Sequence, residues 1–496
     1  MDDYRQLKKH FHETGYLHRA ISLLDWDHET YLPAKGVPFR ADQQAFLSRL
    51  AHERLTSNRV ADLIASCESN STAMNATQQA NIRAWRRDRD RAVKLPTDFV
   101  EHFEKTCALG KAAWTEARRT SQFELFASHL EQLVELSRKK ADYYGYKEHP
   151  YDALMDEYEP GCTNRILTPI FEQLKQSIVS WLPYGIEKTN QIPSNLLESN
   201  YPIQDQAKFN TMVARAMGFD FQSGRIDTTT HPFCTDLGPH DVRLTTRYEL
   251  KDFAVSLYSV LHEAGHGLYE QGFCPEHAGT PMAEAVSLGI HESQSRLWEN
   301  KVGRAPEFWS EWYGKACQCL PSLKPFSPEE ITMAVNRVSP SFIRVEADEV
   351  TYDLHIILRF ELEKLLISGD LPVKDVPKVW NARFKEMFGI EVPDDTHGCL
   401  QDIHWSMGGF GYFPTYTLGN LHSAQLYAAA EKTLGHRIHL LQDGCYTPLL
   451  DWLRSNVHQH GRRHEPATLI REATGQDIQA SFHGEYLKKR LEAIGV

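Results

Sequence analysis

Two histidines and a glutamate lie at a spacing that suits metal chemistry. His262 and His266 stand four residues apart, and Glu263 directly follows the first histidine. On a helix this spacing brings both imidazoles to one face, where one zinc ion can accept a nitrogen from each. In this HExxH pattern the glutamate carboxylate reaches the water that the metal activates. The segment therefore predicts a hydrolytic metal centre with Glu263 as the general base.

The HExxH pattern alone is only suggestive, because the chain has 24 histidines. With that many, an accidental match somewhere in the chain has a chance of roughly one in ten. The alternative is a histidine pair that packs in the core or faces solvent on an amphipathic helix. Residues 254–261 are almost wholly apolar. Polar side chains at the end of a buried helix need partners, and a metal ion provides them. This context favours the metal centre.

A catalytic zinc needs a third protein ligand and an open fourth position. A second segment with helical periodicity, residues 282–298 and the residue after it, offers Glu284, His291, Glu292 and Glu299. One class of HExxH peptidases takes its third ligand from a glutamate on a later helix, which favours Glu292, but spacing alone leaves Glu284 open. Thermolysin-like enzymes carry an aspartate four residues after this glutamate. Arg296 occupies that position here, so the chain is not a close thermolysin relative.

The rest of the chain is dominated by apolar residues at three- and four-residue spacing, which is typical of helices. This pattern covers residues 5–23, 38–55, 96–145, 164–182 and 204–218. Strand-like sequence is scarce. It is clearest at residues 241–248, with a shorter partner near 226–230. No internal repeat or long linker divides the chain. We therefore expect one mainly helical domain over residues 1–496, with a small sheet beside residues 250–300.

Charge and composition limit the classes of partner. The formal net charge is −12, which argues against nucleic acid or an anionic membrane as the main partner. The polar N-terminus lacks the apolar stretch of a secretory signal, and no window approaches the roughly 18 apolar residues of a membrane helix. The nine cysteines are scattered, as is common for reduced thiols. These features predict a cytoplasmic protein.

Six short motifs follow one another along most of the chain. They are His231-Pro-Phe233, Asp241-x-Arg243-x-Thr245, His262-Glu-Ala-Gly-His266, His291-Glu-Ser-Gln294, Ile343-Arg-x-x-Ala-Asp348 and Gly398-x-x-Gln-Asp-x-His-Trp405. In these motifs and their order the chain resembles the carboxypeptidase Taq family of metallocarboxypeptidases. The resemblance implies Glu292 as third ligand and a homodimer. It also implies a helical fold similar to neurolysin and angiotensin-converting enzyme, in which two lobes flank a deep central groove.

The segment around His404 can supply hydrogen-bond donors to a substrate. A histidine, a glycine pair and a tyrosine twelve residues after the histidine resemble the arrangement in neurolysin-type enzymes. By that resemblance His404 contacts the substrate or the oxyanion, and Tyr416 stabilises the transition state. Tyr412 is the competing tyrosine and a candidate substrate-binding residue. The alternative is that this aromatic loop is simply packing.

An exopeptidase must recognise a terminal carboxylate, and an arginine fork binds one through two hydrogen bonds. Arg344 is the favoured anchor because it lies within one of the six motifs. The alternative role for Arg344 is a structural salt bridge to Asp348, four residues further along the same helix. Arg243, in the expected strand, is the second candidate anchor. A strand beside the active-site helix could also pair with an extended peptide.

Together these features predict a zinc metallocarboxypeptidase of broad specificity that acts on peptides, with cobalt as an alternative metal. A first alternative is a zinc oligopeptidase or dipeptidase that cuts short peptides internally by the same chemistry. A second alternative is a peptide-binding protein that keeps zinc for stability. The presence of Glu263 argues against the second alternative, because a structural zinc site needs no general base.

Overall fold

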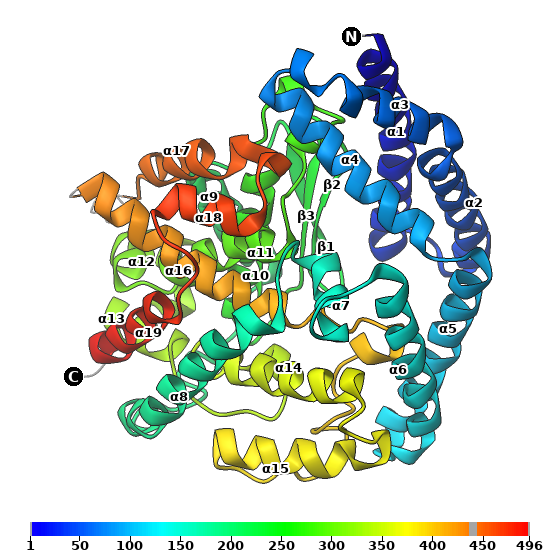
Figure 1. Ribbon diagram of the computed structural model, residues 1–496. Coiled ribbons are helices and arrows are strands. Elements are labelled where there is room, and N and C mark those ends of the chain that lie inside the picture. Colours follow the sequence, from blue (N-terminus) through cyan, green and yellow to red (C-terminus); the bar gives the residue numbers. More distant parts are fainter. Residues whose placement is uncertain (1, 436–443, 495–496) are drawn as a thin grey trace.

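Helices make up most of the computed structural model, which describes residues 2–435 and 444–494 (Figure 1). The first half contains α1 (Asp2–Thr30), α2 (Val37–Thr56), α3 (Asn58–Ser69), α4 (Ala76–Lys94), α5 (Thr97–Thr120), α6 (Glu124–Tyr144), α7 (Pro150–Tyr158), α8 (Asn164–Thr189) and α9 (Ile203–Met217). The second half contains α10 (Phe253–Glu270), α11 (Leu288–Arg296), α12 (Pro306–Cys319), α13 (Pro328–Val335), α14 (Tyr352–Ser368), α15 (Val376–Phe388), α16 (Pro414–Leu434), α17 (Thr447–Asn456), α18 (Pro466–Thr474) and α19 (Ala480–Ile494). Within the described ranges, none of these helices has the length and apolar character to cross a bilayer.

The mainly helical fold predicted from periodicity is confirmed. The region expected at 96–145 is two helices, α5 and α6, because the chain turns at Ser121. Ser121 takes a left-handed conformation with φ of 53° and ends α5. Such a residue stops a helix by redirecting the backbone. Periodicity alone did not reveal this break, since the apolar spacing continues across it.

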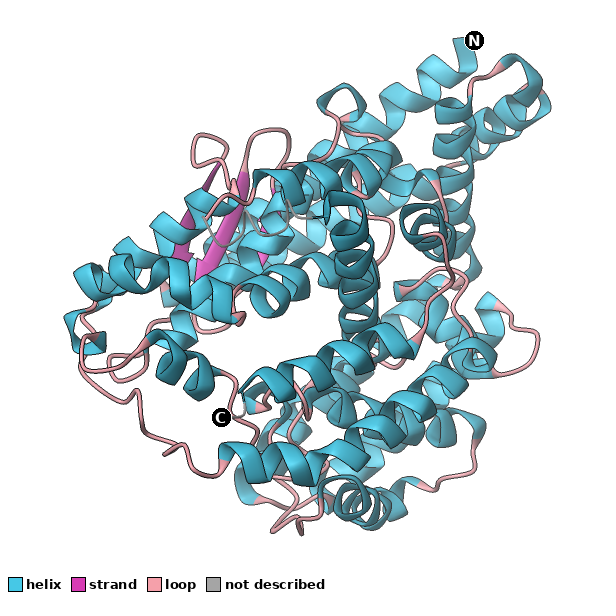
Figure 2. Ribbon diagram, turned by 90° about the vertical axis from the view of Figure 1, so that its left-hand side faces the viewer, coloured by secondary structure: helices cyan, strands magenta, loops and turns pink. Residues whose placement is uncertain are grey.

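The small sheet has three strands, β1 (Gly224–Thr228), β2 (Cys234–Asp236) and β3 (Val242–Thr246), in the order β1-β3-β2 (Figure 2). β3 is parallel to β1 and antiparallel to β2. The strands expected near 226–230 and 241–248 are present with slightly different bounds. β2, which the sequence did not predict, is short and forms an edge of the sheet.

The core consists of two large clusters of buried apolar side chains and a small third one. The first large cluster joins α5 to α8 with α14 and α15, and the second surrounds α10 with α9, α12 and α17. α16 contributes Leu418 and Leu421 to the first, and Leu426 and Ala430 to the second. The third holds α1, α3 and α4 together. α16 therefore fixes the two large clusters relative to each other.

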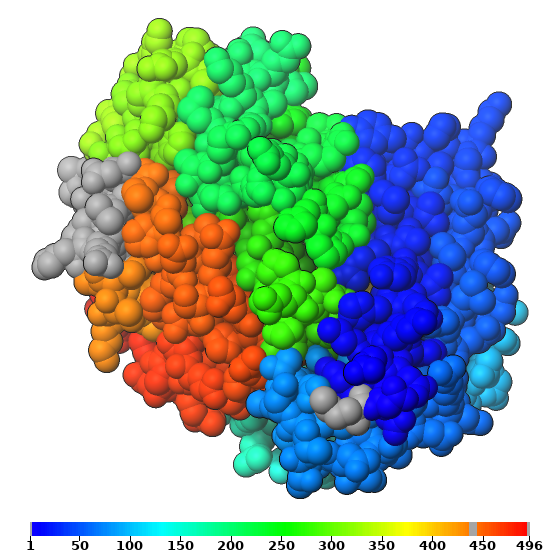
Figure 3. Space-filling view, turned by 90° about the horizontal axis from the view of Figure 1, so that it is seen from above, coloured from blue at the N-terminus to red at the C-terminus, as the bar shows by residue number. Residues whose placement is uncertain are grey.

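The N-terminal helices lie side by side with the segment that carries the sheet, as Figure 3 shows in blue and green. The hydroxyl of Tyr31 donates to Asp227 of β1 at 2.6 Å. Arg19 of α1 pairs with Asp236 of β2 at 3.2 Å. These polar contacts hold the N-terminal helices against both outer strands of the sheet.

Candidate metal centre

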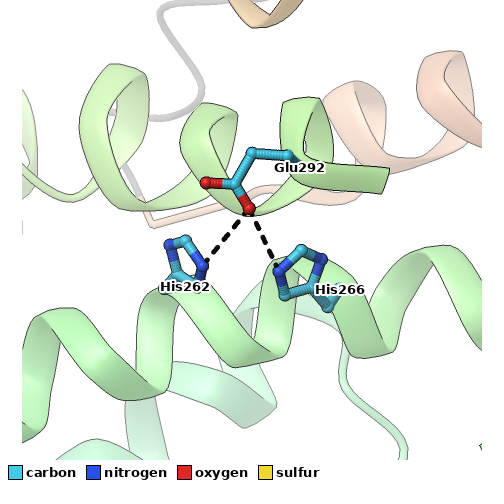
Figure 4. A group of neighbouring side chains, drawn as sticks. All are labelled: His262, His266 and Glu292. Atoms are coloured by element: carbon cyan, nitrogen blue, oxygen red, sulfur yellow. Dashed lines mark ion pairs between the residues drawn. The ribbon is translucent and has the colours of Figure 1, made fainter. Parts of the chain in front are cut away.

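Helix α10 carries His262, Glu263 and His266 near its C-terminal end. It begins after Asp252, whose side chain accepts a hydrogen bond from the backbone N–H of Ala254. Apolar side chains on several faces of α10 are buried in the second large cluster. This burial fixes the rotation of the helix about its axis. Both imidazoles consequently point toward α11 (Figure 4).

Helix α11 supplies Glu292 from the opposite side. The sequence predicted one helix over residues 282–298, and this is wrong in its first part, where residues 281–283 form a separate 3-10 turn. α11 begins at Leu288, because the side chain of Ser287 accepts a hydrogen bond from the N–H of Ile290 and caps the helix. Serine is a preferred residue at this capping position.

Two glycines allow α11, which carries Glu292, to pack closely against α10 and α16. A Cβ at Gly265 would lie 2.6 Å from the backbone of Gln294 and Ser295. A Cβ at Gly419 of α16 would lie 2.4 Å from Cγ of Glu292. Side chains larger than hydrogen at these positions would push α11 away from its neighbours. The separation between Glu292 and the histidines therefore depends on both glycines.

The three side chains face a common centre. Oε2 of Glu292 lies 3.6 Å from Nε2 of His262 and 3.5 Å from Nε2 of His266 (Figure 4). One ligand atom from each residue lies within 4.8 Å of the other two. Zinc binds nitrogen and oxygen at about 2.0–2.2 Å, so two ligands of a tetrahedral ion lie about 3.4 Å apart. The donor set and its spacing thus fit a divalent metal ion.

Each histidine is oriented through its other ring nitrogen. Nδ1 of His262 lies 2.9 Å from Oε2 of Glu299, and Nδ1 of His266 lies 3.1 Å from the backbone carbonyl oxygen of His291. Such acceptors hold the proton on Nδ1 and leave Nε2 free to bind a metal. Glu299 was one of the candidate ligands, but it supports His262 instead. A π-helical turn over Leu297–Val302 carries it, and such turns often occur at functional sites.

The other two candidate ligands have partners of their own. Glu284 pairs with Arg462 at 3.0 Å. His291 binds Glu270 through Nε2 at 2.8 Å. Glu292 is the carboxylate that lies beside the two histidines.

Arg296 and the two histidines that face Glu292 favour the ionised form of its carboxyl. Nε of Arg296 donates to Oε1 of Glu292 at 2.7 Å. Burial opposes ionisation of Glu292, but Arg296 and His262 outweigh it and hold the pKa of this carboxyl well below its usual range. Burial raises the pKa of Glu263 to about 7, with the charge of Glu292 acting in the same direction and His262 against it.

A second group of side chains gathers around Tyr416 at the start of α16. Its hydroxyl lies 3.5 Å from Nε2 of His404, and its ring meets the ring of Tyr412 with centroids 5.5 Å apart. Burial lowers the pKa of His404 to about 4, so the imidazole is neutral at neutral pH. Burial raises the pKa of Tyr412, and the charge of Glu292 raises it further. Burial and the charge of Glu292 also raise the pKa of Tyr416, so both hydroxyls favour their protonated form.

Arg344 points into this second group. Its guanidinium lies 5.1 Å from the centre of the Tyr416 ring. Nε and Nη2 both contact Oδ1 of Asp402 at 2.9 Å, and Nη1 donates to the hydroxyl of Tyr352 at 3.2 Å. The expected alternative, a salt bridge to Asp348 on the same helix, is wrong. Residues 344–346 form only a 3-10 turn, and Asp348 instead accepts hydrogen bonds from the residues that precede α14.

Arg243 lies in a different environment from Arg344. Its Nε and Nη2 bind the two carboxylate oxygens of Asp241 at 2.8 and 2.9 Å. Its guanidinium lies 4.3 Å from the ring centre of Trp26 in α1. Arg243 thus contributes to the contact between the sheet and the N-terminal helices.

Glu363 of α14, which the sequence did not single out, organises the loop between Arg344 and α16. Its carboxylate accepts hydrogen bonds from Tyr151 Oη at 2.5 Å, Trp405 Nε1 at 2.7 Å and Gly411 N at 3.0 Å. Glu363 is fully buried. A buried carboxylate with three donors fixes their relative positions. No local pattern in the sequence indicates this role, because the donors come from two segments, α7 and the loop before α16, that are both distant from Glu363 in sequence.

A cavity lies beside the beginning of α11, on the side of Tyr412. It has a volume of about 570 Å³, and its lining includes Ser287, Leu288 and Tyr158. The Tyr158 ring packs edge-on against Tyr412 at 5.1 Å. Its lining includes none of the three candidate metal ligands, so this cavity is separate from the centre that they face.

Known proteins are similar to this sequence over nearly its whole length. The family model of the carboxypeptidase Taq (M32) metallopeptidases matches residues 6–491. Thermostable carboxypeptidase 1 of Thermus thermophilus is 39% identical, covering 99% of this chain and 98% of its own. Carboxypeptidase 1 of Bacillus subtilis is 37% identical, covering 96% of this chain and 95% of its own.

Solved structures agree with this relationship. The M32 carboxypeptidase from Deinococcus radiodurans has a TM-score of 0.97 and 39% identity, with 100% of both chains covered. The carboxypeptidase from Pyrococcus furiosus has a TM-score of 0.95 and 35% identity, with 99% of both chains covered. The predicted family is confirmed, and the protein is a peptide hydrolase that requires a divalent metal ion. The chain belongs to the carboxypeptidase Taq (M32) family of metallopeptidases.

Proposed function

We propose that this chain is a zinc-dependent carboxypeptidase that removes C-terminal residues from a broad range of peptides, with His262, His266 and Glu292 as zinc ligands. Two imidazole nitrogens and one carboxylate oxygen are a typical donor set of catalytic zinc, and three protein ligands leave one position open. When bound there, zinc supplies a Lewis acid for the scissile carbonyl and lowers the pKa of water. The observed separations of 3.5 and 3.6 Å between the ligand atoms support this assignment.

Glu263 acts as the general base in this proposal. Its carboxylate is 6% exposed and comes from the residue directly after His262. It takes a proton from the attacking water and transfers this proton to the amine that leaves as the peptide bond breaks. Burial in a site with little water makes such a transfer efficient, because few competing water molecules are present.

Arg344 binds the terminal carboxylate in this proposal. The observation that supports the exopeptidase assignment is the presence of free N–H donors on its guanidinium. Arginine has five N–H donors, and three of them face Asp402 and Tyr352. One donor on Nη1 and one on Nη2 have no partner among the described residues. Free donors on both terminal nitrogens suit a carboxylate, which can accept one hydrogen bond on each oxygen. Arg344 is also nearly buried, at 7% exposed, so an anion bound there is partly removed from water.

Contacts through Tyr352 connect Arg344 to the metal centre. The Tyr352 hydroxyl accepts the hydrogen bond from Arg344. The guanidinium of Arg296 lies 4.4 Å from the ring centre of Tyr352, and Arg296 binds Glu292. Two side chains, Tyr352 and Arg296, therefore connect the carboxylate anchor to the third metal ligand, and this short path suits hydrolysis of the last peptide bond.

His404, Tyr412 and Tyr416 contact the substrate in this proposal. The neutral His404 ring can donate one hydrogen bond, and its Nδ1 is buried without a partner among the described residues. The Tyr416 hydroxyl can donate to the oxyanion, which lowers the energy of the transition state. Tyr412, next to the cavity, binds the substrate chain. The cytoplasmic location and the homodimer stay predictions, which cell fractionation and sedimentation can test.

Two blocked peptides test whether the enzyme removes the C-terminal residue or cleaves peptides internally. We expect release of the C-terminal residue from an N-acylated peptide with a free carboxylate, and no cleavage when the same peptide is C-amidated. Internal cleavage of the amidated peptide would support the oligopeptidase alternative and contradict the role of Arg344. Elemental analysis of the protein identifies the metal and is expected to give one zinc ion per chain.

The variant E263Q tests the general base. We expect it to keep its metal and lose activity by about 10²- to 10⁴-fold, the usual contribution of a general base. The exposed Glu276 lies further along the chain after α10, and E276Q serves as the matched control with unchanged turnover. Wild-type turnover in E263Q with full metal content would refute this mechanism.

A further inference from the structure

We propose that Arg296 is a positioning residue that makes Glu292 bind the metal through one oxygen only. This inference rests on the proposed metal site. Oε2 of Glu292 faces both histidines, while Oε1 points away from them (Figure 4). Oε1 is the oxygen that accepts the hydrogen bond from Nε of Arg296 at 2.7 Å. Oε2 of Glu292 is thus available to the metal, whereas Oε1 is bound to Arg296.

The position of Arg296 is itself strongly constrained. Its guanidinium lies over the Tyr352 ring at 4.4 Å, and its Nη1 lies 3.4 Å from Oε2 of Glu299. Arginine does not lose its proton in proteins and has no acceptor. Its hold on Oε1 therefore persists at any pH at which the protein is folded, and this oxygen cannot turn toward the metal without breaking the shorter of the two carboxylate contacts of a buried cation.

Binding of Glu292 through one oxygen matters because it determines how many coordination positions of the metal the protein fills. Two histidine nitrogens and two carboxylate oxygens would fill all four positions of a tetrahedral ion. With Oε1 held by Arg296, Glu292 fills a single position and one position stays open. Arg296 also lies between Glu292 and Glu299, whose negative charges would otherwise repel each other. A residue with no contact to the substrate thus preserves the open position.

Arg304 provides a matched control. Like Arg296 it is largely buried, and its Nη2 lies 3.4 Å from Oε1 of Glu299. Its guanidinium also lies over an aromatic ring, that of Tyr258, at 4.0 Å. Among the described residues the hydrogen-bond and ion-pair partners of its guanidinium are Glu299, Asn300 and Val335, and Glu292 is not one of them. The variants R296M and R304M therefore both remove a buried cation that pairs with Glu299, but only R296M releases Oε1 of Glu292.

The experiment is a set of high-resolution crystal structures of wild type, R296M and R304M loaded with zinc, together with visible spectra of the cobalt-loaded proteins. In wild type and R304M we expect one oxygen of Glu292 at about 2.0–2.2 Å from zinc and the other on Arg296. In R296M we expect both oxygens on zinc. The cobalt absorption bands, which report coordination geometry, should change in R296M and stay unchanged in R304M.

The possible outcomes separate this inference from the proposed function. Binding of both Glu292 oxygens to zinc in the wild-type protein overturns the role of Arg296, and this result needs no variant to fold. One-oxygen binding that persists in R296M, with an unchanged cobalt spectrum, overturns it too. A wild-type protein that binds no metal at His262 and His266 contradicts the proposed function instead.

Discussion

Asp402 contacts Arg344 at 2.9 Å and Arg359 at 2.5 Å, so one buried carboxylate holds two buried guanidinium groups. Burial opposes ionisation of Asp402, but Arg359 and Arg344 outweigh it and hold its pKa well below the usual range. Asp402 binds the Nε and Nη2 side of Arg344. The guanidinium of Arg344 lies 5.1 Å from the centre of the Tyr416 ring, and two predictions depend on the contact with Asp402.

Replacement of Arg344 by methionine should weaken the recognition of a terminal carboxylate. A hydrogen bond to a charged group contributes about 1.5–3 kcal/mol, so we expect kcat/KM for peptides with a free C-terminus to fall about 10- to 150-fold. R243M tests the other candidate anchor and should have a much smaller effect, because the Arg243 guanidinium lies over Trp26, in the contact between the sheet and the N-terminal helices. Steady-state kinetics on one peptide decide between them, and a larger loss in R243M contradicts our assignment.

Asp402 should also be important for stability. In D402N, two buried arginines lose their counter-charge, and breaking a buried ion pair in this way costs about 3–5 kcal/mol. We expect chemical denaturation to show a loss of this size. D241N removes the partner of Arg243, but Asp241 is substantially exposed, so its loss should be about 0–1 kcal/mol. Equal losses in the two variants would argue against a special role for Asp402.

The local parts of the metal centre could be predicted from the sequence because they depend on helix geometry alone. His262 and His266 share a face of α10 because they are four residues apart. The spacing of the apolar residues predicts that this helix is largely buried. The choice of Glu292 over Glu284 as third ligand depended on the family resemblance, since both glutamates follow the HExxH motif in the sequence. The structure separates them through the late start of α11 at Leu288.

Contacts between distant segments could not be predicted. Asp402 lies 58 residues from Arg344, while Asp348, only four residues away, had the better local spacing. The support of His262 by Glu299 depends on a π-helical turn, which no periodicity rule anticipates. Glu363 accepts hydrogen bonds from two distant segments, α7 and the loop before α16. In each case the contact depends on how distant segments pack in the fold, and residue spacing in the sequence does not predict this packing.

His458 should make the protein sensitive to acid. Burial and the nearby charges of Arg454 and His291 lower its pKa from 6.5 to about 3. As the pH falls below 6.5, the unfolded chain takes up a proton at this histidine while the folded protein does not, so stability falls. At about 1.4 kcal/mol per pH unit, the loss between pH 6.5 and 5 is about 2 kcal/mol.

The variant H458Q cannot take up this proton and should lose less stability than wild type over the same pH range. Urea denaturation at pH 7 and pH 5 measures the difference. The exposed His102 of α5 gives the control H102Q, which should follow wild type. An H458Q protein with the wild-type pH dependence would contradict this account.

Gly419 should be essential for the distance between Glu292 and the histidines. In G419A the new methyl group would meet Cγ of Glu292 at 2.4 Å, so α11 must shift and we expect weaker metal binding, measured by competition with a chelator. Gly314 in α12 has open space around it, and G314A should bind metal normally and gain up to about 1 kcal/mol from helix propensity. Both variants add one methyl group to a helix, so only the contact with Glu292 distinguishes them. Wild-type metal affinity in G419A would show that Glu292 does not depend on this close approach.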